Sequence, residues 1–172
     1  MSASDRGNSP GIPCKEKKGM EIKTKNFGTV EYQEQDTIQF PRGLPGLPNL
    51  KRFLILAFHE MLPLKFMQSL DDPLYSFVLV NPSLLEPGYS YELSPEDCAD
   101  LSLQPDEAVL HYIIVTVPND PMQITGNFRA PVIINTRNMH AKQVILADSR
   151  YSISASVPEI LSRQSLDAEK KG

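Results

Sequence analysis

The chain has 172 residues, 41% of them hydrophobic, and its 21 acidic and 17 basic residues give a formal net charge of -4. This length predicts one domain with a proper core, because single domains commonly hold about 100 to 200 residues. The acidic balance argues against direct binding of nucleic acid, since phosphates are bound mainly by Lys and Arg. No apolar run approaches the roughly 18 residues of a membrane span. Two cysteines are too few for a disulfide framework, so we expect a soluble cytoplasmic protein.

Composition divides the chain into three parts. Residues 1–19 are polar and rich in Ser, Gly and Pro, as in a flexible N-terminal leader. Residues 20–160 carry the periodic apolar pattern and form the expected domain. Residues 161–172 end in a charged stretch and are expected to be a C-terminal tail that frays or extends a short helix.

The expected domain consists mainly of short apolar or alternating runs separated by Pro, Gly, Asn and Asp, a pattern typical of strands and turns. It predicts about ten short strands. The run 109–115 is apolar on both strand faces, which indicates a central strand covered on both sides. The candidate strands in chain order are 22–27, 29–32, 37–40, 53–58, 75–80, 90–93, 108–117, 122–128, 132–135, 143–147 and 151–157.

One helix is predicted near residues 94–103. Ser94 can cap its first turn, Pro95 suits the first helical position, and Asp97 stands three residues after the cap, as in a capping box. The expected fold is therefore mainly β, an antiparallel barrel-like single domain whose closure protects its strand edges, with one short helix.

Charge is distributed unevenly along the chain. Residues 66–128 hold ten acids and no Lys or Arg, whereas the rest of the chain holds 11 acids and all 17 bases. Such a window repels phosphate and attracts basic proteins, so a basic protein partner is one interpretation and a solvated acidic face is the other. The ten acids are Asp71, Asp72, Glu86, Glu92, Glu96, Asp97, Asp100, Asp106, Glu107 and Asp120.

Side chains with catalytic or metal-binding chemistry are scattered. The histidines stand far apart at His59, His111 and His140, outside any metal-ligand spacing. His111 lies within an apolar strand, where a hydrogen-bonded core imidazole is the favoured interpretation. Cys98 on the predicted helix is interpreted as a packing residue. We expect no enzyme activity, no cofactor and no metal site.

The adjacent Asp71 and Asp72 are the nearest approach to a paired-carboxylate site. Neighbouring residues on an extended chain point apart, and Pro73 makes a turn more favourable than a shared proton or a bound cation.

Five strings, in this order along residues 20–157, resemble those of the FliW family of flagellar assembly factors. Phe128 in the fourth string stands where the family usually has Leu, and residues 140–142 replace a turn that commonly contains Gly. The strings are Phe40-Pro41-Arg42-Gly43-Leu44-Pro45-Gly46, Gln68-Ser69-Leu70-Asp71-Asp72-Pro73, Val115-Thr116-Val117-Pro118, Phe128-Arg129-Ala130-Pro131-Val132-Ile133-Ile134-Asn135 and Gln143-Val144-Ile145-Leu146.

The resemblance implies a non-enzymatic protein that binds flagellin in the cytoplasm and antagonises CsrA, a basic translational regulator of flagellin mRNA. Charge steering favours acidic loops as the CsrA contact. An apolar groove that takes an amphipathic helix would suit flagellin. The expected flagellin contacts are Leu64, Phe66 and Met67. The expected CsrA contacts are Gln68, Asp71, Asp72, Glu92, Glu96, Asp97 and Asp100.

Two other function classes remain open from the sequence. A small barrel could hold a flavin-like ligand in its mouth, with Tyr75, Tyr112 and Arg129 as contacts. A purely structural subunit is the other alternative, suggested only by the abundance of predicted strand.

Overall fold

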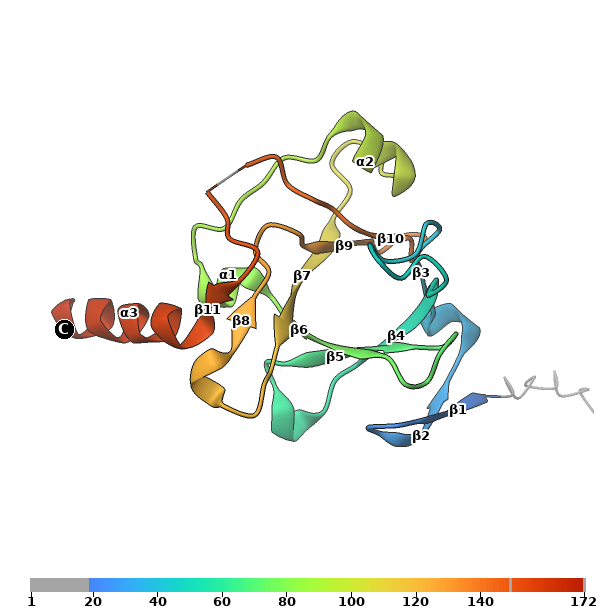
Figure 1. Ribbon diagram of the computed structural model, residues 1–172. Helices are drawn as coiled ribbons and strands as arrows, with labels where there is room; N and C mark the ends of the chain where they lie inside the picture. Colours follow the sequence, from blue (N-terminus) through green and yellow to red (C-terminus); the bar gives the residue numbers. More distant parts are fainter. Residues whose placement is uncertain (1–18, 149, 172) are drawn as a thin grey trace, which may run out of the picture.

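The computed structural model describes residues 19–148 and 150–171 (Figure 1). The expected flexible leader thus lies, except for Gly19, outside the described residues. The described residues are mainly β, as predicted, and include one short helix where residues 94–103 indicated it. The strands are β1 (Met20–Thr24), β2 (Gly28–Tyr32), β3 (Ile38–Gln39), β4 (Arg52–Leu56), β5 (Lys65–Ser69), β6 (Ser76–Val80), β7 (Val109–Thr116), β8 (Thr125–Gly126), β9 (Val132–Asn135), β10 (Ala141–Gln143) and β11 (Ala155–Ser156).

Short helices lie between these strands, and one longer helix follows the last of them. The α-helices are α1 (Pro82–Leu85), α2 (Pro95–Asp100) and α3 (Val157–Lys170), and the 3-10 helices are η1 (Glu34–Asp36), η2 (His59–Met61) and η3 (Pro121–Gln123). The capping box of α2 is present as predicted: the Ser94 hydroxyl accepts a hydrogen bond from the Asp97 amide, and the Asp97 carboxylate accepts one from the Ser94 amide. None of these helices is both long enough and apolar enough to span a lipid bilayer.

The main sheet is antiparallel and follows the order β10-β9-β7-β6-β5-β4-β3, with β8 beside β7 and β11 beside β8. The predicted central strand is confirmed, since β7 pairs with β6, β8 and β9. β1 and β2 form a separate hairpin. Gly28 supports its turn with a backbone φ of 67°, a conformation that side chains with a Cβ resist.

The two edges of the main sheet meet at one place. Gln39, in the edge strand β3, forms an isolated parallel bridge with His140, just before the other edge strand β10. The Gln39 amide donates to the Met139 carbonyl at 2.9 Å. We call this contact the seam. Because the paired strands form no closed ladder across it, the barrel-like part of the prediction is not confirmed.

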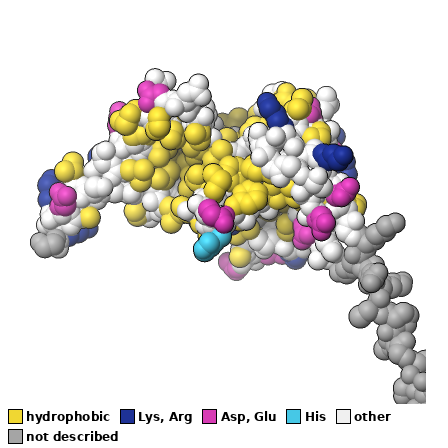
Figure 2. Space-filling model, turned by 90° about the horizontal axis from the view of Figure 1, so that it is seen from below, with side chains coloured by type: hydrophobic (Ala, Val, Ile, Leu, Met, Phe, Trp, Pro, Cys, Tyr) yellow, Lys and Arg dark blue, Asp and Glu magenta, His cyan; other side chains and the backbone are white. Residues whose placement is uncertain are grey.

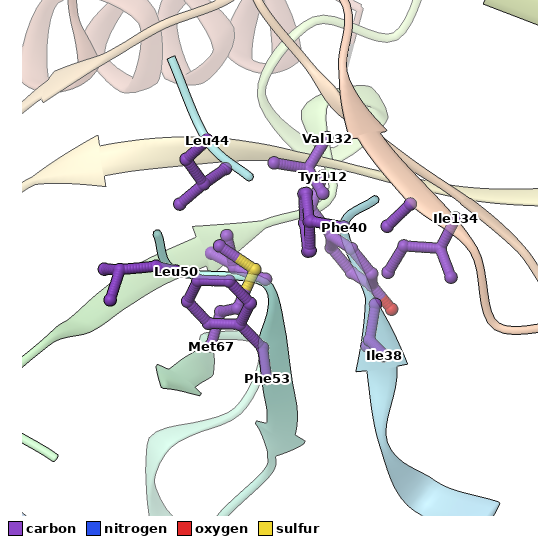
Figure 3. Close-up of a cluster of buried hydrophobic side chains, with 11 residues drawn as sticks. Ile38, Phe40, Leu44, Leu50, Phe53, Met67, Tyr112, Val132 and Ile134 are labelled. Atoms are coloured by element: carbon purple, nitrogen blue, oxygen red, sulfur yellow. The ribbon is translucent and has the colours of Figure 1, made fainter. Parts of the chain in front are cut away.

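The curved sheet separates two clusters of buried side chains. One lies on its concave side (Figure 3), where the rings of Phe40 and Phe53 meet edge to face at 5.1 Å. The other contains Ile113, Phe128 and Ile160 and is covered by α1 and the start of α3. Strand β7 supplies residues to both clusters, which is why its sequence is apolar on both faces.

Five expected elements differ from the observed ones. Residues 122–128 were expected to be a strand but hold part of η3 and the two-residue β8, and of the expected strand 143–147 only Gln143 lies in a strand, β10. Residues 65–69 form β5, for which no strand was predicted. Residues 90–93 are extended but pair with no strand among the described residues. Residues 151–157 were expected to be a strand, but only Ala155–Ser156 is one, and Val157 begins α3. The boundary expected after residue 160 falls inside this 14-residue helix, so residues 161–170 of the expected tail continue it.

Candidate partner-binding surface

The acidic window does not form a continuous unpaired surface, because basic side chains from outside it fold back onto it. Arg42 pairs with Glu96 and Asp100, and Arg52 pairs with Asp71. Arg137 pairs with Glu107, and Lys142 pairs with Asp97 and Asp100. Much of the window's charge is therefore neutralised within the fold.

The most connected ion-pair group fastens α2 to β10. Lys142 Nζ lies 2.7 Å from Asp97 Oδ1 and 2.8 Å from Asp100 Oδ2, and Arg42 lies 2.8 Å from Asp100 Oδ1. Burial alone would raise the pKa of Asp97, but hydrogen bonds from Lys142 and Ser94 outweigh it and hold that pKa below its ordinary value. Asp97 and Asp100 thus act mainly inside the fold.

We expect Lys142→Met to lower the free energy of unfolding by about 1–3 kcal/mol at pH 7, because it leaves the partly buried Asp97 without its cation and Asp100 with Arg42 alone. A carboxyl with a lowered folded-state pKa contributes stability above its ordinary pKa of 3.8, and loses that contribution as the pH falls through the folded value. Urea unfolding at pH 7 and pH 3 should show the difference between variant and parent shrinking in acid. Lys142→Arg is the control that keeps the charge, and an equal difference at both pH values would contradict this account.

The expected contact Gln68 is fully buried. Its side-chain amide donates to the carbonyls of Ser69, Pro73 and Tyr75 at 2.9, 3.2 and 3.1 Å, so it fixes the path of the following loop. A partner cannot reach this side chain without unfolding the loop. The expectation that Gln68 touches CsrA is therefore wrong.

The loop that follows, residues 70–75, is held from several sides. The buried Ser69 hydroxyl accepts from the amides of Asp71 and Asp72, at 3.2 and 3.1 Å. The Asp71 carboxylate accepts from the Lys51 and Arg52 amides at 2.7 and 2.8 Å and from Arg52 Nε at 2.9 Å. Burial opposes ionisation of Asp71, but these bonds hold its pKa below the ordinary value. Asp71 thus ties the loop to β4.

This rigid loop presents side chains that the sequence interpretation did not select. Leu74 is 66% exposed and Tyr75 is 39% exposed. Asp72 bonds to the Leu74 amide at 3.0 Å and makes no ion pair within the described part of the chain. The signal in the sequence was a pair of large residues directly after an Asp-Pro turn, where side chains tend to project.

The expected flagellin surface is wrong for two of its three residues. Met67 is fully buried because it faces the first core cluster from β5, and Phe66, which points to the opposite side of this strand, is only 8% exposed. The Phe66 ring packs against those of Phe27 and Phe58, with centroids 5.0 and 5.8 Å away. Leu64 is half-buried and packs against the second core cluster.

Exposed apolar side chains occur beside these positions instead. Figure 2 shows apolar groups gathered across the face of the molecule seen from below, the side on which Figure 1 places η2 and η3. Large exposed residues in and next to these two helices are Met61, Leu62, Val117 and Met122, with Met122 72% exposed. We call these four residues the apolar band.

His111 is a hydrogen-bonded, partly buried imidazole, as its place in an apolar strand predicted. Its Nδ1 lies 3.0 Å from the Tyr91 hydroxyl, and burial lowers the pKa of the imidazole. Burial also raises the pKa of Tyr91 to about 12, so this phenol keeps its proton at neutral pH.

The pKa of His111 predicts an acid-sensitive contribution to stability. Because the folded-state pKa lies below the unfolded one, the contribution is complete above about pH 6.5 and is lost as the pH falls from there through the folded value. The urea midpoint of the parent should drop between pH 7.5 and 5.5, and that of His111→Gln should drop less. Parallel pH profiles for the two proteins would refute the assignment.

The contacts expected for a flavin-like ligand do not come together. The groove that contains Tyr112 is lined by neither Tyr75 nor Arg129. Tyr112 instead has its hydroxyl 2.8 Å from Lys65 Nζ. Within the described residues, no group of three or more His, Cys, Asp or Glu side chains is arranged to hold a metal ion.

Comparison with known proteins places this fold among relatives. The family model described as "FliW protein" matches residues 21–157. The chain belongs to the FliW family. The "Flagellar assembly factor FliW" of Thermoanaerobacter pseudethanolicus is 37% identical over 143 residues, which cover 83% of this chain and 95% of that protein. The protein of the same name from Shouchella clausii is 34% identical over 138 residues, 80% of this chain and 94% of the relative.

A solved structure supports the same family assignment. The crystal structure of a flagellar assembly factor FliW superposes with a TM-score of 0.75 at 32% identity, and the match covers 80% of this chain and 96% of that one. The FliW string at residues 40–46 has a structural basis here. Gly43 has a φ of 70°, and a Cβ at this position would lie 2.5 Å from the Pro48 carbonyl oxygen, so the loop needs glycine.

Proposed function

We propose that this FliW-family protein is a non-enzymatic partner switch in the cytoplasm, which binds flagellin and, when flagellin is scarce, binds CsrA and relieves its repression of flagellin mRNA. The observation that carries the proposal is family membership, since relatives that match over nearly their whole length are named flagellar assembly factors.

Charge supports a basic partner, but through fewer residues than the sequence indicated. Of the expected CsrA contacts, Glu92 is exposed and makes no ion pair with any described residue. Glu96 lies 3.6 Å from Arg42, and both side chains are largely exposed, so a partner can compete for this carboxylate. With Asp72 on the rigid loop, these three carboxylates are the expected CsrA contacts that stay available for steering.

The apolar band supports the flagellin half of the proposal. An amphipathic helix buries its apolar stripe in a complementary surface, and Met side chains adapt to such partners. The band replaces the buried Phe66 and Met67 as our proposed flagellin contact.

The test is calorimetry of the purified protein with flagellin and with CsrA separately, followed by competition between them. Both should bind, and addition of flagellin should release CsrA. Failure to bind either protein, or a stable ternary complex, would reject the switch.

Charge reversal tests the steering. We expect Glu92→Lys with Glu96→Lys to slow association with CsrA severalfold at low salt and to weaken its salt dependence, because exposed charges act mainly on encounter rates. Stopped-flow kinetics at two salt concentrations measure this. Glu21→Lys, a reversal on the distant β1, is the matched control. Equal association rates for the double variant and the parent would show that Glu92 and Glu96 do not steer CsrA.

A further inference from the structure

A groove of about 790 Å³ lies between two segments that are distant in sequence. One wall is residues 90–95, between α1 and α2, and the other contains residues 146–148, which follow β10, and Arg150. Part of the floor is apolar, because Leu93 is half-buried and Leu146 is buried in the second core cluster.

The wall after β10 is a free sheet edge. The antiparallel register of β10 with β9 continues beyond the assigned strand, since the amides of Val144 and Leu146 donate to the carbonyls of Pro131 and Arg129, each at 2.9 Å. Backbone groups alternate in direction along a strand, so the N–H and C=O groups of Ile145 point away from β9, and the ladder ends at a bend at Ala147. These groups and those of Ala147 have no partner among the described residues.

The opposite wall is also unpaired. The backbone N–H and C=O groups of Tyr91, Glu92 and Leu93 form no hydrogen bond within the described ranges 19–148 and 150–171. The preceding residue, Ser90, is fixed: its amide donates to the Tyr151 hydroxyl and its carbonyl accepts from the same hydroxyl, each at 2.9 Å. Both walls of the groove therefore offer main-chain donors and acceptors. An unpaired edge is a template for another strand, whose backbone supplies the missing bonds.

The charges and the exposed apolar side chain around the groove indicate which kind of segment it can bind. Arg150, the basic residue of the lining, is already paired with Asp148 at 2.6 Å. Glu92 on the other wall is unpaired within the described residues, and Glu96 follows at the end of this wall. The side chain of Ile145, 70% exposed, stands beside the free edge. The occupant that fits is an extended strand with basic residues and an apolar residue for Ile145.

We propose that this groove binds one extended strand of a basic protein partner by β-strand addition to the edge at Ile145 and Ala147. The inference rests on the function proposed above, under which that partner is CsrA.

Ala147→Pro tests the edge, because proline removes an unpaired N–H while edge positions otherwise tolerate it. We expect affinity for purified CsrA to fall about tenfold or more, since a main-chain hydrogen bond and a close strand contact are both lost. Ala147→Ser keeps the N–H and should bind within about twofold of the parent. Melting curves check that both variants fold.

Amide hydrogen exchange of the full-length parent tests the same claim without any variant. The amides of Ile145 and Ala147, and those of residues 91–93, should exchange rapidly in the free protein and become protected when CsrA is added. Binding without protection there, together with unchanged affinity of Ala147→Pro, overturns the groove and leaves the proposed function standing. If the parent does not bind CsrA at all, both the groove as a binding site and the proposed function are overturned. Protection caused by flagellin instead, or by raising the concentration of this protein alone, overturns the basic partner as occupant.

Discussion

Replacing Phe66 with alanine should lower the free energy of unfolding by about 3–5 kcal/mol, the cost of truncating a buried aromatic side chain and leaving a cavity. Phe66 lies in β5 with 8% exposure and joins two aromatic rings from other segments. One of them is Phe27, in the turn of the β1–β2 hairpin. Among the described residues, the strands of this hairpin pair with no strand of the main sheet. The hairpin should therefore loosen first. Urea unfolding measures the loss.

The matched control is Met122→Ala, which removes an equally apolar side chain that is 72% exposed. It should change stability by no more than about 0.5 kcal/mol, as surface substitutions usually do. A Phe66→Ala variant as stable as the control would show that the ring cluster does not hold the hairpin. The control variant also removes part of the apolar band, so it should weaken flagellin binding while leaving the fold intact.

Gln68→Leu should cost about 2–4 kcal/mol, because leucine has a similar size but cannot donate to the carbonyls of Ser69, Pro73 and Tyr75. The Pro73 and Tyr75 carbonyls keep the amides of Lys25 and Ser69 as donors, so the cost comes from losing three hydrogen bonds at once and from the weaker solvation of these buried carbonyls. The loop at residues 70–75 should become mobile, and its amides should lose protection. Denaturant unfolding and amide exchange together measure both effects.

Gln104→Leu, the same change at an exposed position, is the control and should be nearly neutral. If Gln68→Leu is equally neutral, the amide does not organise the loop. If the variant is destabilised but keeps its loop protection, the cost comes from the β5 strand instead.

Local patterns predicted the parts of the fold that local chemistry decides. The apolar run at 109–115 indicated β7, and Ser94 with Asp97 indicated α2. β5 was missed because Lys65–Ser69 contains Lys and Gln and no β-branched aliphatic residue, so neither alternation nor an apolar run stands out. Gln68 is tolerated there because three carbonyls of the following residues receive its amide protons.

The start of α3 carried a signal that was not used. Ser156 and Glu159 are spaced as a capping box, and Pro158 suits the first turn; the Ser156 hydroxyl does accept from the Glu159 amide. The β-branched Ile153 and Val157 favoured a strand over residues 151–157, but only Ala155 and Ser156 pair as one. Here the capping spacing was the better guide.

The candidate surface could be predicted less well, because it depends on which residues meet in space. Ten acids without a nearby base in the sequence indicated an acidic face, yet Arg52 and Lys142, among others, reach that window only after the sheet has formed. Phe66 and Met67 likewise looked available in a sequence with no assigned strand. The free edge at Ile145 is visible only once the register with β9 is known.

The seam has a consequence for how the protein is made. Its two halves, Gln39 and His140, come from opposite ends of the fold. A ribosome synthesises the N-terminal part first, so β3 must wait for the last strands to emerge before its edge is covered. Contacts between such distant parts of a chain also form slowly. The nascent chain therefore exposes a strand edge and an unfinished apolar core for most of its synthesis, and this is the period in which it most needs protection from aggregation.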